Sequence, residues 1–176
     1  MSALINAVQQ FLDSMDWKDE IQIDEEQGRS TMATSILVEQ QPCRLFVETA
    51  NRTDLISVFL YAPFHVRADK ITQACVLANA INLRNRVGHI EIMADDGRIR
   101  FVHTMDFEGC TPSGTAVHNM VHAGLALFSR RLGQLAEVAM TSRGAAEILA
   151  AEEAGQAAPA AEAGEGQGVE GVPEAL

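Results

Sequence analysis

Residues 79–105, with the sequence NAINLRNRVGHIEIMADDGRIRFVHTM, decide the fold class of this chain. A helix-like run ends within this stretch, and two strand-like runs then flank Asp96-Gly97, a preferred pair for a two-residue type I′ turn. With that turn, Ile92 would lie opposite Phe101. The period of two in a strand then places apolar residues of both arms on one face, namely Ile90, Ile92, Ala94, Ile99 and Phe101. The stretch therefore predicts a β-hairpin with one buried face.

Segments before the hairpin predict further strands. Short alternating apolar runs predict strands over residues 32–39, 44–49 and 55–62. Gln41-Pro42 would form the first turn, because proline cannot donate to a strand ladder. The Ile21/Ile23 alternation leaves two interpretations open, a weak strand or an extended arm.

Three helices are expected around these strands. Apolar spacings of one, three and four predict a helix over residues 3–15. A second helix is expected over residues 69–86, capped by Asp69 and with the apolar stripe Ile71, Ala74, Cys75, Ala78 and Ile81. Thr111-Pro112 would open a third helix over residues 112–140, because proline tolerates the first helical turn. The order α-β-β-β-α-β-β-α has few long crossovers, so it predicts an α+β fold with an antiparallel sheet.

The chain has 176 residues and a formal net charge of −11, which is unevenly distributed. From Ser142 onward, seven glutamates stand against one arginine, which gives −6 there and leaves −5 for residues 1–141. No nucleic-acid partner is expected, because such binding needs a concentrated basic surface. The composition changes to Ala, Glu, Gly and Pro from Gly144 onward, which separates an α+β domain over residues 1–141 from a mostly disordered acidic tail over residues 142–176. Within this tail, residues 145–154 could extend or fray from the last helix.

Deleting residues 156–176 should leave the thermal stability almost unchanged, because this segment has too few large apolar side chains to pack against a domain. We expect calorimetry to show a change in Tm of less than about 5 °C. A larger drop, roughly 1 kcal/mol or more for a domain of this size, would show that the segment docks.

The three cysteines, Cys43, Cys75 and Cys110, lie far apart and are odd in number. This pattern favours free, reduced thiols in a cytoplasmic protein. The first residues lack the positive charge and long apolar run of a secretory signal, and no run approaches about 18 apolar residues. We therefore expect a cytoplasmic location and no membrane partner.

The hairpin and its neighbours resemble the YbjN family of bacterial sensory transduction regulators, whose fold is similar to that of type III secretion chaperones. The residues that carry the resemblance are Asn79, Asn82 and Asn85 at a helix end, the Gly88–Ile92 strand, the Asp96–Phe101 return and the long helix after Cys110-Thr111-Pro112. It covers roughly residues 1–141 in element order, while the long acidic tail departs from it. Chaperones of the similar fold are small, acidic and usually dimeric, and they bind extended segments of a partner protein. The resemblance therefore implies a non-enzymatic protein with no catalytic residues to carry over.

Two hypotheses about function remain from the sequence. The first is a non-enzymatic protein-interaction module, regulatory or chaperone-like, that binds a segment of a partner protein and needs no cofactor. The alternative is a small metal-dependent or thiol-dependent enzyme that uses His118 and His122 or Cys110.

The candidate chemical residues also have structural interpretations. His118 and His122 are four apart on a helix, a spacing that suits a metal, but Asn119 replaces the glutamate of an HExxH site and no third ligand is evident. His103 would lie near the end of a strand, where a boundary histidine needs no catalytic role. Cys110 precedes a helix N-terminus, which could lower a thiol pKa, although an ordinary loop cysteine explains it equally.

A homodimer is expected from the length of the third helix. This helix would outrun the core and leave apolar surface around Leu132, Leu135 and Val138 for a second copy. The competing interpretation is that the N-terminal helix, with Phe11 and Trp17, covers this stripe within one chain.

Overall fold

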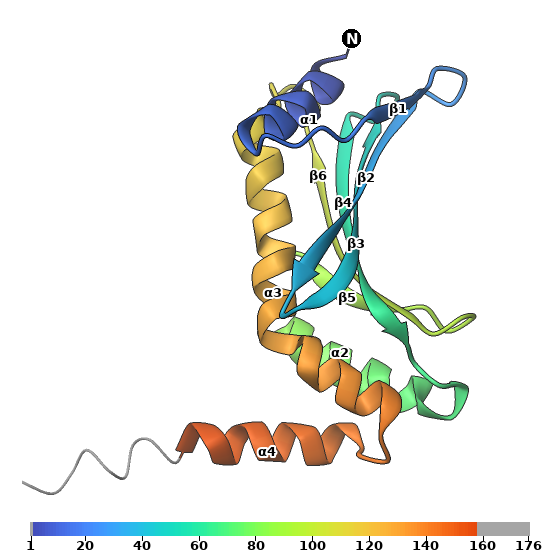
Figure 1. The fold of residues 1–176 in the computed structure, drawn as a ribbon, viewed down its shortest axis with the longest axis vertical. Helices are drawn as coiled ribbons and strands as arrows, with labels where there is room; N and C mark the ends of the chain where they lie inside the picture. Colours follow the sequence, from blue (N-terminus) through green and yellow to red (C-terminus); the bar gives the residue numbers. More distant parts are fainter. Residues whose placement is uncertain (1, 158–176) are drawn as a thin grey trace, which may run out of the picture.

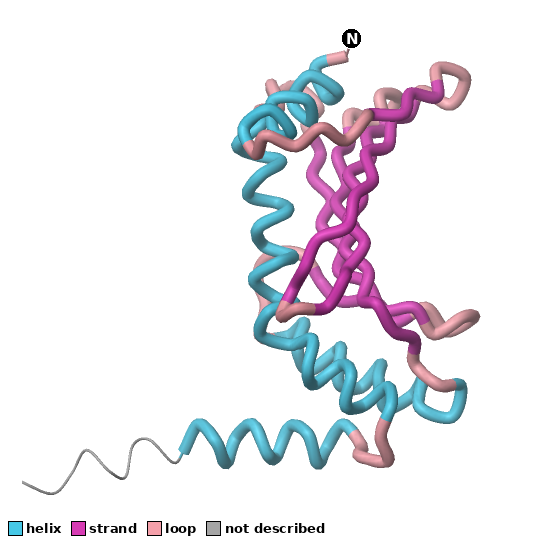
Figure 2. Tube along the Cα trace, in the orientation of Figure 1, coloured by secondary structure: helices cyan, strands magenta, loops and turns pink. Residues whose placement is uncertain are grey.

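The computed structural model describes residues 2–157, in which helices lie on one side of a single antiparallel sheet (Figures 1 and 2). The strands are β1 (Ile21–Asp24), β2 (Arg29–Val38), β3 (Gln41–Ala50), β4 (Leu55–His65), β5 (His89–Ile92) and β6 (Arg98–Asp106). The helices are α1 (Ala3–Ser14), α2 (Ile71–Leu83), α3 (Gly114–Met140) and α4 (Ala145–Ala157), with a short 3-10 turn η1 (Ala68–Lys70) before α2. The spatial order of the strands is β1-β2-β3-β4-β6-β5.

The predicted α+β class and the antiparallel sheet are confirmed. Two elements add to the predicted order: residues 21–24 form a strand, and residues 145–157 form a helix beyond α3. Ala145 and Ile148 of α4 are buried in the core, so ordered packing continues past residue 141. The disorder predicted for the tail lies outside the described residues from residue 158 onward.

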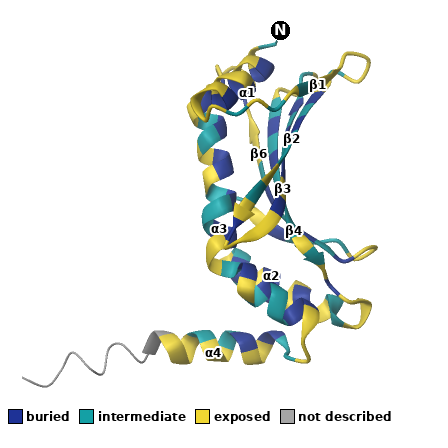
Figure 3. Ribbon diagram, viewed as in Figure 1, coloured by how far each residue is buried: buried dark blue, intermediate teal, exposed yellow. Residues whose placement is uncertain are grey.

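The core lies between the inner face of the sheet and the apolar stripes of α1, α2 and α3 (Figure 3). Alternate residues of β3 and β4 point into it, as the strand period requires: Cys43, Leu45, Val47, Ile56, Val58 and Leu60. The predicted α2 stripe is correct except at Cys75, which is exposed. Leu77, which the predicted stripe did not include, is buried in the core.

The hairpin exists, but its predicted register is wrong by two residues. Ile92 lies opposite Ile99 rather than Phe101, and residues 94–97 form the loop. Only Gly97 of the expected turn pair has positive φ, and its N–H donates to the carbonyl of Met93 at 2.7 Å. A type I′ turn needs positive φ at both centres, so this longer turn replaces it. A shift of two keeps every side chain on its face, although Ala94 moves into the loop and is exposed.

The turn between β2 and β3 lies two residues before the predicted position. Glu39 and Gln40 both have positive φ and form the two-residue turn, whereas Pro42 pairs with Leu37 inside the ladder. Proline fits there because, in such a hairpin, Pro42 belongs to a pair without hydrogen bonds and its nitrogen points away from β2. On that other side, pairing between β3 and β4 begins only at Arg44.

The predicted N-caps of α2 and α3 are both wrong. Asp69 lies in η1 and pairs with Arg67 at 2.9 Å instead of capping α2, which ends at Leu83 rather than residue 86. The N-cap of α3 is Ser113, whose Oγ accepts from the N–H of Ala116 at 3.2 Å. The helix starts after Pro112 because Gly114 packs closely on α1. The N–H of Gly114 donates a hydrogen bond to the side-chain oxygen of Gln10 at 3.1 Å.

Candidate functional site

Among residues 2–157, one face of the sheet carries no helix; this face is the candidate site, and we call it the outer sheet face. It consists of outward residues of three adjacent strands, namely Arg44, Phe46 and Glu48 of β3, Phe59 and Tyr61 of β4, and Arg98 and Arg100 of β6. These residues alternate with the buried core residues of the same strands. The rings of Phe46, Phe59 and Tyr61 are half-buried although no helix of the described part of the chain covers them.

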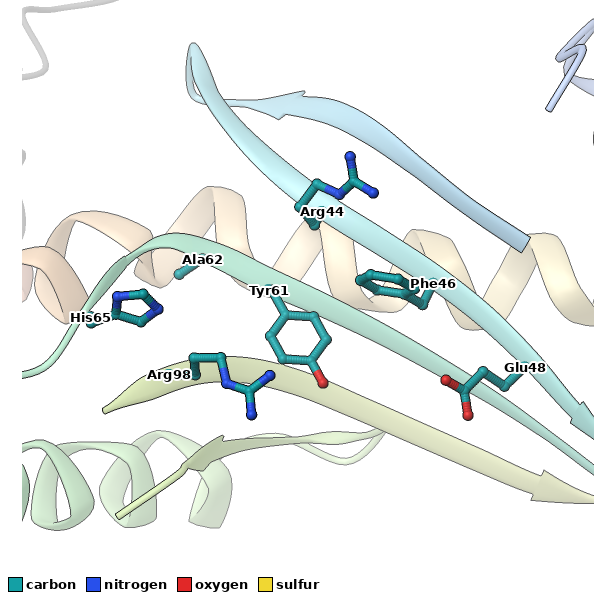
Figure 4. Close-up of a pocket in the computed structure, with 7 residues that line it drawn as sticks. All are labelled: Arg44, Phe46, Glu48, Tyr61, Ala62, His65 and Arg98. Carbon is teal, nitrogen blue, oxygen red and sulfur yellow. The ribbon is translucent and has the colours of Figure 1, made fainter. Parts of the chain in front are cut away.

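A hollow of about 320 Å³ opens on this face, centred on Tyr61 (Figure 4). It forms where the ladder between β4 and β6 becomes irregular: Tyr61 pairs with Arg100, but the next pair is His65 with Arg98. Four residues of β4 therefore span two residues of β6, which is the geometry of a bulge and bends the strand locally. Arg44 and Arg98 lie on opposite sides of Tyr61 in the close-up (Figure 4).

Stacked guanidinium and aromatic groups line the hollow. The rings of Phe46 and Tyr61 meet edge to face, with centroids 5.6 Å apart. The guanidinium carbon of Arg44 lies 5.7 Å from the Phe46 centroid, and that of Arg98 lies 5.8 Å from the Tyr61 centroid. Such cation–π contacts orient a guanidinium without using its N–H donors.

A polar network holds the neighbouring part of the face in place. The guanidinium of Arg100 donates to Glu91 at 2.7 Å and to the hydroxyl of Tyr61 at 3.0 Å, and it lies 4.8 Å from the Phe59 centroid. Burial alone would raise the pKa of Glu91, but hydrogen bonds from Arg100 and His89 outweigh it and lower that pKa. Glu91 therefore stays ionised and fixes Arg100, which in turn fixes Tyr61.

The histidines predicted as possible ligands form a stacked pair on α3. The rings of His118 and His122 are 6.2 Å apart with an interplanar angle of 22°. Within residues 2–157 no group of three or more His, Cys, Asp or Glu side chains could hold a metal ion. His118 also contacts the ring of Phe11 at 6.4 Å, so it joins α3 to α1.

His103 of β6 and His122 of α3 both line a second hollow, which has a volume of about 440 Å³. Its other lining residues are largely apolar and include Val87 and Met105. The Nδ1 atom of His103 is buried and makes no hydrogen bond with the described residues. Burial lowers the pKa of His103, His89 lowers it further, and the main chain of Met120 raises it in part.

The cysteines are separated from these hollows. Cys110 is exposed in the loop before Ser113 and its side chain has no hydrogen-bonded acid or base within the described part of the chain. Cys43 is buried on the inner face of the sheet, where burial raises its pKa to about 11. The structure thus brings His103 near His122 but leaves Cys110 apart from them.

Stability should fall between pH 7.5 and pH 5.5 in a manner that depends on His103. Its pKa in the folded chain is below the ordinary value of 6.5, so the unfolded chain binds more protons in this range. The stabilising effect of neutral His103 is complete above about pH 6.5 and is lost as the pH falls towards the folded pKa. Urea titrations at several pH values, followed by the fluorescence of Trp17, measure this slope.

The His103→Gln variant provides the control, because glutamine keeps a polar side chain but does not titrate. We expect a shallower loss of unfolding free energy in this variant over the same range. An identical slope in both proteins would contradict the prediction.

Sequence reasoning did not single out the outer sheet face as a site. In the predicted hairpin, burial of Ile99 and Phe101 leaves Arg98 and Arg100 on the opposite face by alternation, and the structure has this arrangement. The same alternation in β3, with Arg44 and Phe46 between buried residues, was the available signal. It shows which face a residue occupies but not which distant strand lies beside it.

The architecture defines a class of protein, an α+β domain with helices on one face of an antiparallel sheet and an open opposite face. A chain of the solved structure entitled "Structure of the HopA1-SchA Chaperone-Effector Complex" has this fold, with a TM-score of 0.50 and 19% identity over 73% of this chain and 91% of that chain. A family model matches residues 5–131: YbjN, "Putative bacterial sensory transduction regulator". The chain therefore belongs to the YbjN family. A comparison with the curated proteins gave no match.

Within residues 2–157 the structure contains no helix long and apolar enough to cross a membrane.

Proposed function

We propose that this protein is a non-enzymatic interaction module, regulatory or chaperone-like, that binds an extended segment of a partner protein on the outer sheet face. The observation that carries the proposal is the one-sided sheet, whose open face holds the half-buried rings of Phe46, Phe59 and Tyr61. Aromatic side chains are enriched at protein interfaces because they bury much area at little entropic cost. The proposed location is the cytoplasm, where its thiols would stay reduced.

The family and the fold support the same class of function. The matched family is described as regulatory, and the similar solved structure is that of a chaperone–effector complex. The open face also has rigid support, because Arg100 ties β6 to Tyr61 of β4 and to Glu91 of β5. A preformed surface of this kind reduces the entropic cost of binding.

Photo-crosslinking in cells tests this proposal. A benzoylphenylalanine placed at Thr104, an exposed outward residue of β6, should crosslink to a partner protein. The matched probe at Arg130, exposed on α3, should not give the same product. Phe59→Ala should weaken the Thr104 crosslink. Equal products from both probes, or none from either, would count against the outer sheet face.

The predicted reason for a homodimer is wrong. Leu132, Leu135 and Val138 are buried within one chain, where α3 packs on the sheet and on α2. The N-terminal helix covers a different part of α3, at Gly114 and His118. The homodimer itself stays a prediction.

We place the proposed dimer contact on the outward face of α2 instead. Val76 and Leu83 are 51% and 80% exposed, and a spacing of seven puts them on one helical face. Light scattering at micromolar concentration should give about twice the chain mass of 19.0 kDa. Leu83→Glu should return the mass to that of one chain, whereas Leu37→Glu, another exposed position, should not. A wild-type monomer at about 100 μM would overturn the dimer.

A further inference from the structure

We infer that the hollow around Tyr61 receives the carboxylate side chain of an aspartate or glutamate carried by the partner's extended segment. This inference rests on the proposed function and names the chemistry of the partner at that site. The guanidinium groups of Arg44 and Arg98 would donate to the carboxylate from the two sides of the Tyr61 ring (Figure 4).

The two arginines have donors to spare. A guanidinium carries five N–H donors. Arg44 uses one of its nitrogens to donate to the Oγ of Ser35 at 3.2 Å, and Arg98 uses its Nε to donate to Asp96 at 2.5 Å. Neither side chain makes a further hydrogen bond with the described residues. Both guanidiniums are nevertheless oriented by the ring contacts with Phe46 and Tyr61.

The charges around the hollow favour an anion. Arg44 makes no ion pair within residues 2–157, whereas Arg98 pairs with Asp96, which does not line the hollow. Two arginines and one carboxylate, Glu48, line it, and because Arg98 is paired with Asp96, Arg44 is the lining arginine without a carboxylate partner within residues 2–157. Guanidinium–carboxylate contacts are among the stronger hydrogen bonds in proteins because both partners are ionised.

The shape of the hollow indicates a side chain on an extended segment. Its volume of about 320 Å³ lies at the small end of the range for ligand pockets. Its lining residues belong to the outer sheet face, which lies opposite the described helices, so a passing segment can place one side chain in it while neighbouring residues contact Phe46 and Phe59. The tail of this chain is a less suitable occupant, because α4, which precedes it, lies on the helical side of the sheet (Figure 1).

Selection from a random heptapeptide library on the full chain tests the inference. We expect the enriched peptides to contain aspartate or glutamate, and fluorescence anisotropy to give their affinities. The double variant Arg44→Gln/Arg98→Gln should bind them at least about tenfold more weakly, because it loses two charge-assisted contacts. Replacing the acidic residue of the peptide by its amide should cost a similar factor.

Two further variants separate a local site from a general charge effect. Arg86→Gln/Arg130→Gln removes the same charge at exposed positions that do not line the hollow and should leave binding unchanged. Glu48→Gln removes the carboxylate that faces the same hollow and should strengthen binding severalfold. Circular dichroism verifies that each variant is folded.

The outcomes separate this inference from the proposed function. Peptides that need the outer sheet face but carry no acidic residue, or that bind the double variant equally well, overturn the inference alone. Displacement by a synthetic peptide of residues 158–176 at similar concentration makes the tail the occupant and also overturns it. A loss of dimer mass in the double variant assigns the hollow to a second copy and likewise overturns it. Failure to enrich any peptide, with no crosslinked partner, overturns both.

Discussion

Phe101→Ala should lower the free energy of unfolding by about 3–5 kcal/mol, the usual range for loss of a buried phenylalanine. The ring is fully buried on the inner face of β6, between Ile90 of β5 and Leu60 of β4. Gly88 and Gly124 both lie directly against this ring, with no room for a side chain at either position. Collapse of the surroundings into the cavity is therefore restricted. Urea unfolding monitored by circular dichroism measures the change.

Gly124 provides a matched test of this contact. A Cβ atom at Gly124 would lie 2.7 Å from the Phe101 ring, whereas one at Gly133 of the same helix would meet nothing within 4 Å. Gly133→Ala should stabilise the protein by about 0.5–1 kcal/mol through helix propensity, and Gly124→Ala should destabilise it. In the Phe101→Ala background, Gly124→Ala should become neutral or stabilising. The same sign in both backgrounds would contradict this packing.

Gly97→Ala should destabilise the protein by about 3 kcal/mol or more, from backbone strain and overpacking together. Gly97 has φ of +73°, a region that residues with a Cβ atom disfavour. Its carbonyl accepts from the N–H of Val66 at 2.8 Å, and a Cβ atom would collide with the carbonyl oxygen of Val66. Because the backbone fixes the position of a Cβ atom, and the atoms that it would meet are backbone atoms of Val66, no side-chain rotation relieves the contact. Thermal and urea unfolding measure the loss.

A comparison with Gly109 separates the effect of backbone strain from the effect of overpacking. It has φ of +72°, nearly the same as Gly97, but a Cβ atom there would meet nothing within 4 Å. Gly109→Ala should therefore cost only the strain of the left-handed conformation, about 1–2 kcal/mol. Equal losses at Gly97 and Gly109 would show that the contact with Val66 does not contribute.

The hairpin and the helices show which parts of the fold the sequence pattern could predict. Ile90, Ile99 and Phe101 are buried as expected, because alternation along a strand fixes the face of each side chain. The register was wrong because a shift of two leaves this pattern unchanged, and the contact between Gly97 and Val66 that accompanies the longer turn is not local in sequence. The helix starts were wrong for a similar reason, since Gly114 is placed by its contact with Gln10.

The candidate site was less predictable than the fold. Spacing singled out His118 and His122, which do lie together on α3. It could not place Arg44 beside Tyr61 and Arg98, because these residues come from three strands and their proximity depends on strand order and on the bulge in β4. The sequence showed the chemistry of each side chain, but not which side chains lie next to one another in the fold.

The sequence by itself determined the α+β class, the inward faces of the strands and the apolar stripes of the helices, because periodicity acts within one element. Only the tertiary structure decided that the apolar stripe of α3 is buried within one chain, that α4 packs on the core and that, among residues 2–157, one face of the sheet carries no helix. These features depend on contacts between distant segments. Such contacts form only where the backbone and side chains of distant segments pack closely together, and the periodicity of one element does not determine that packing.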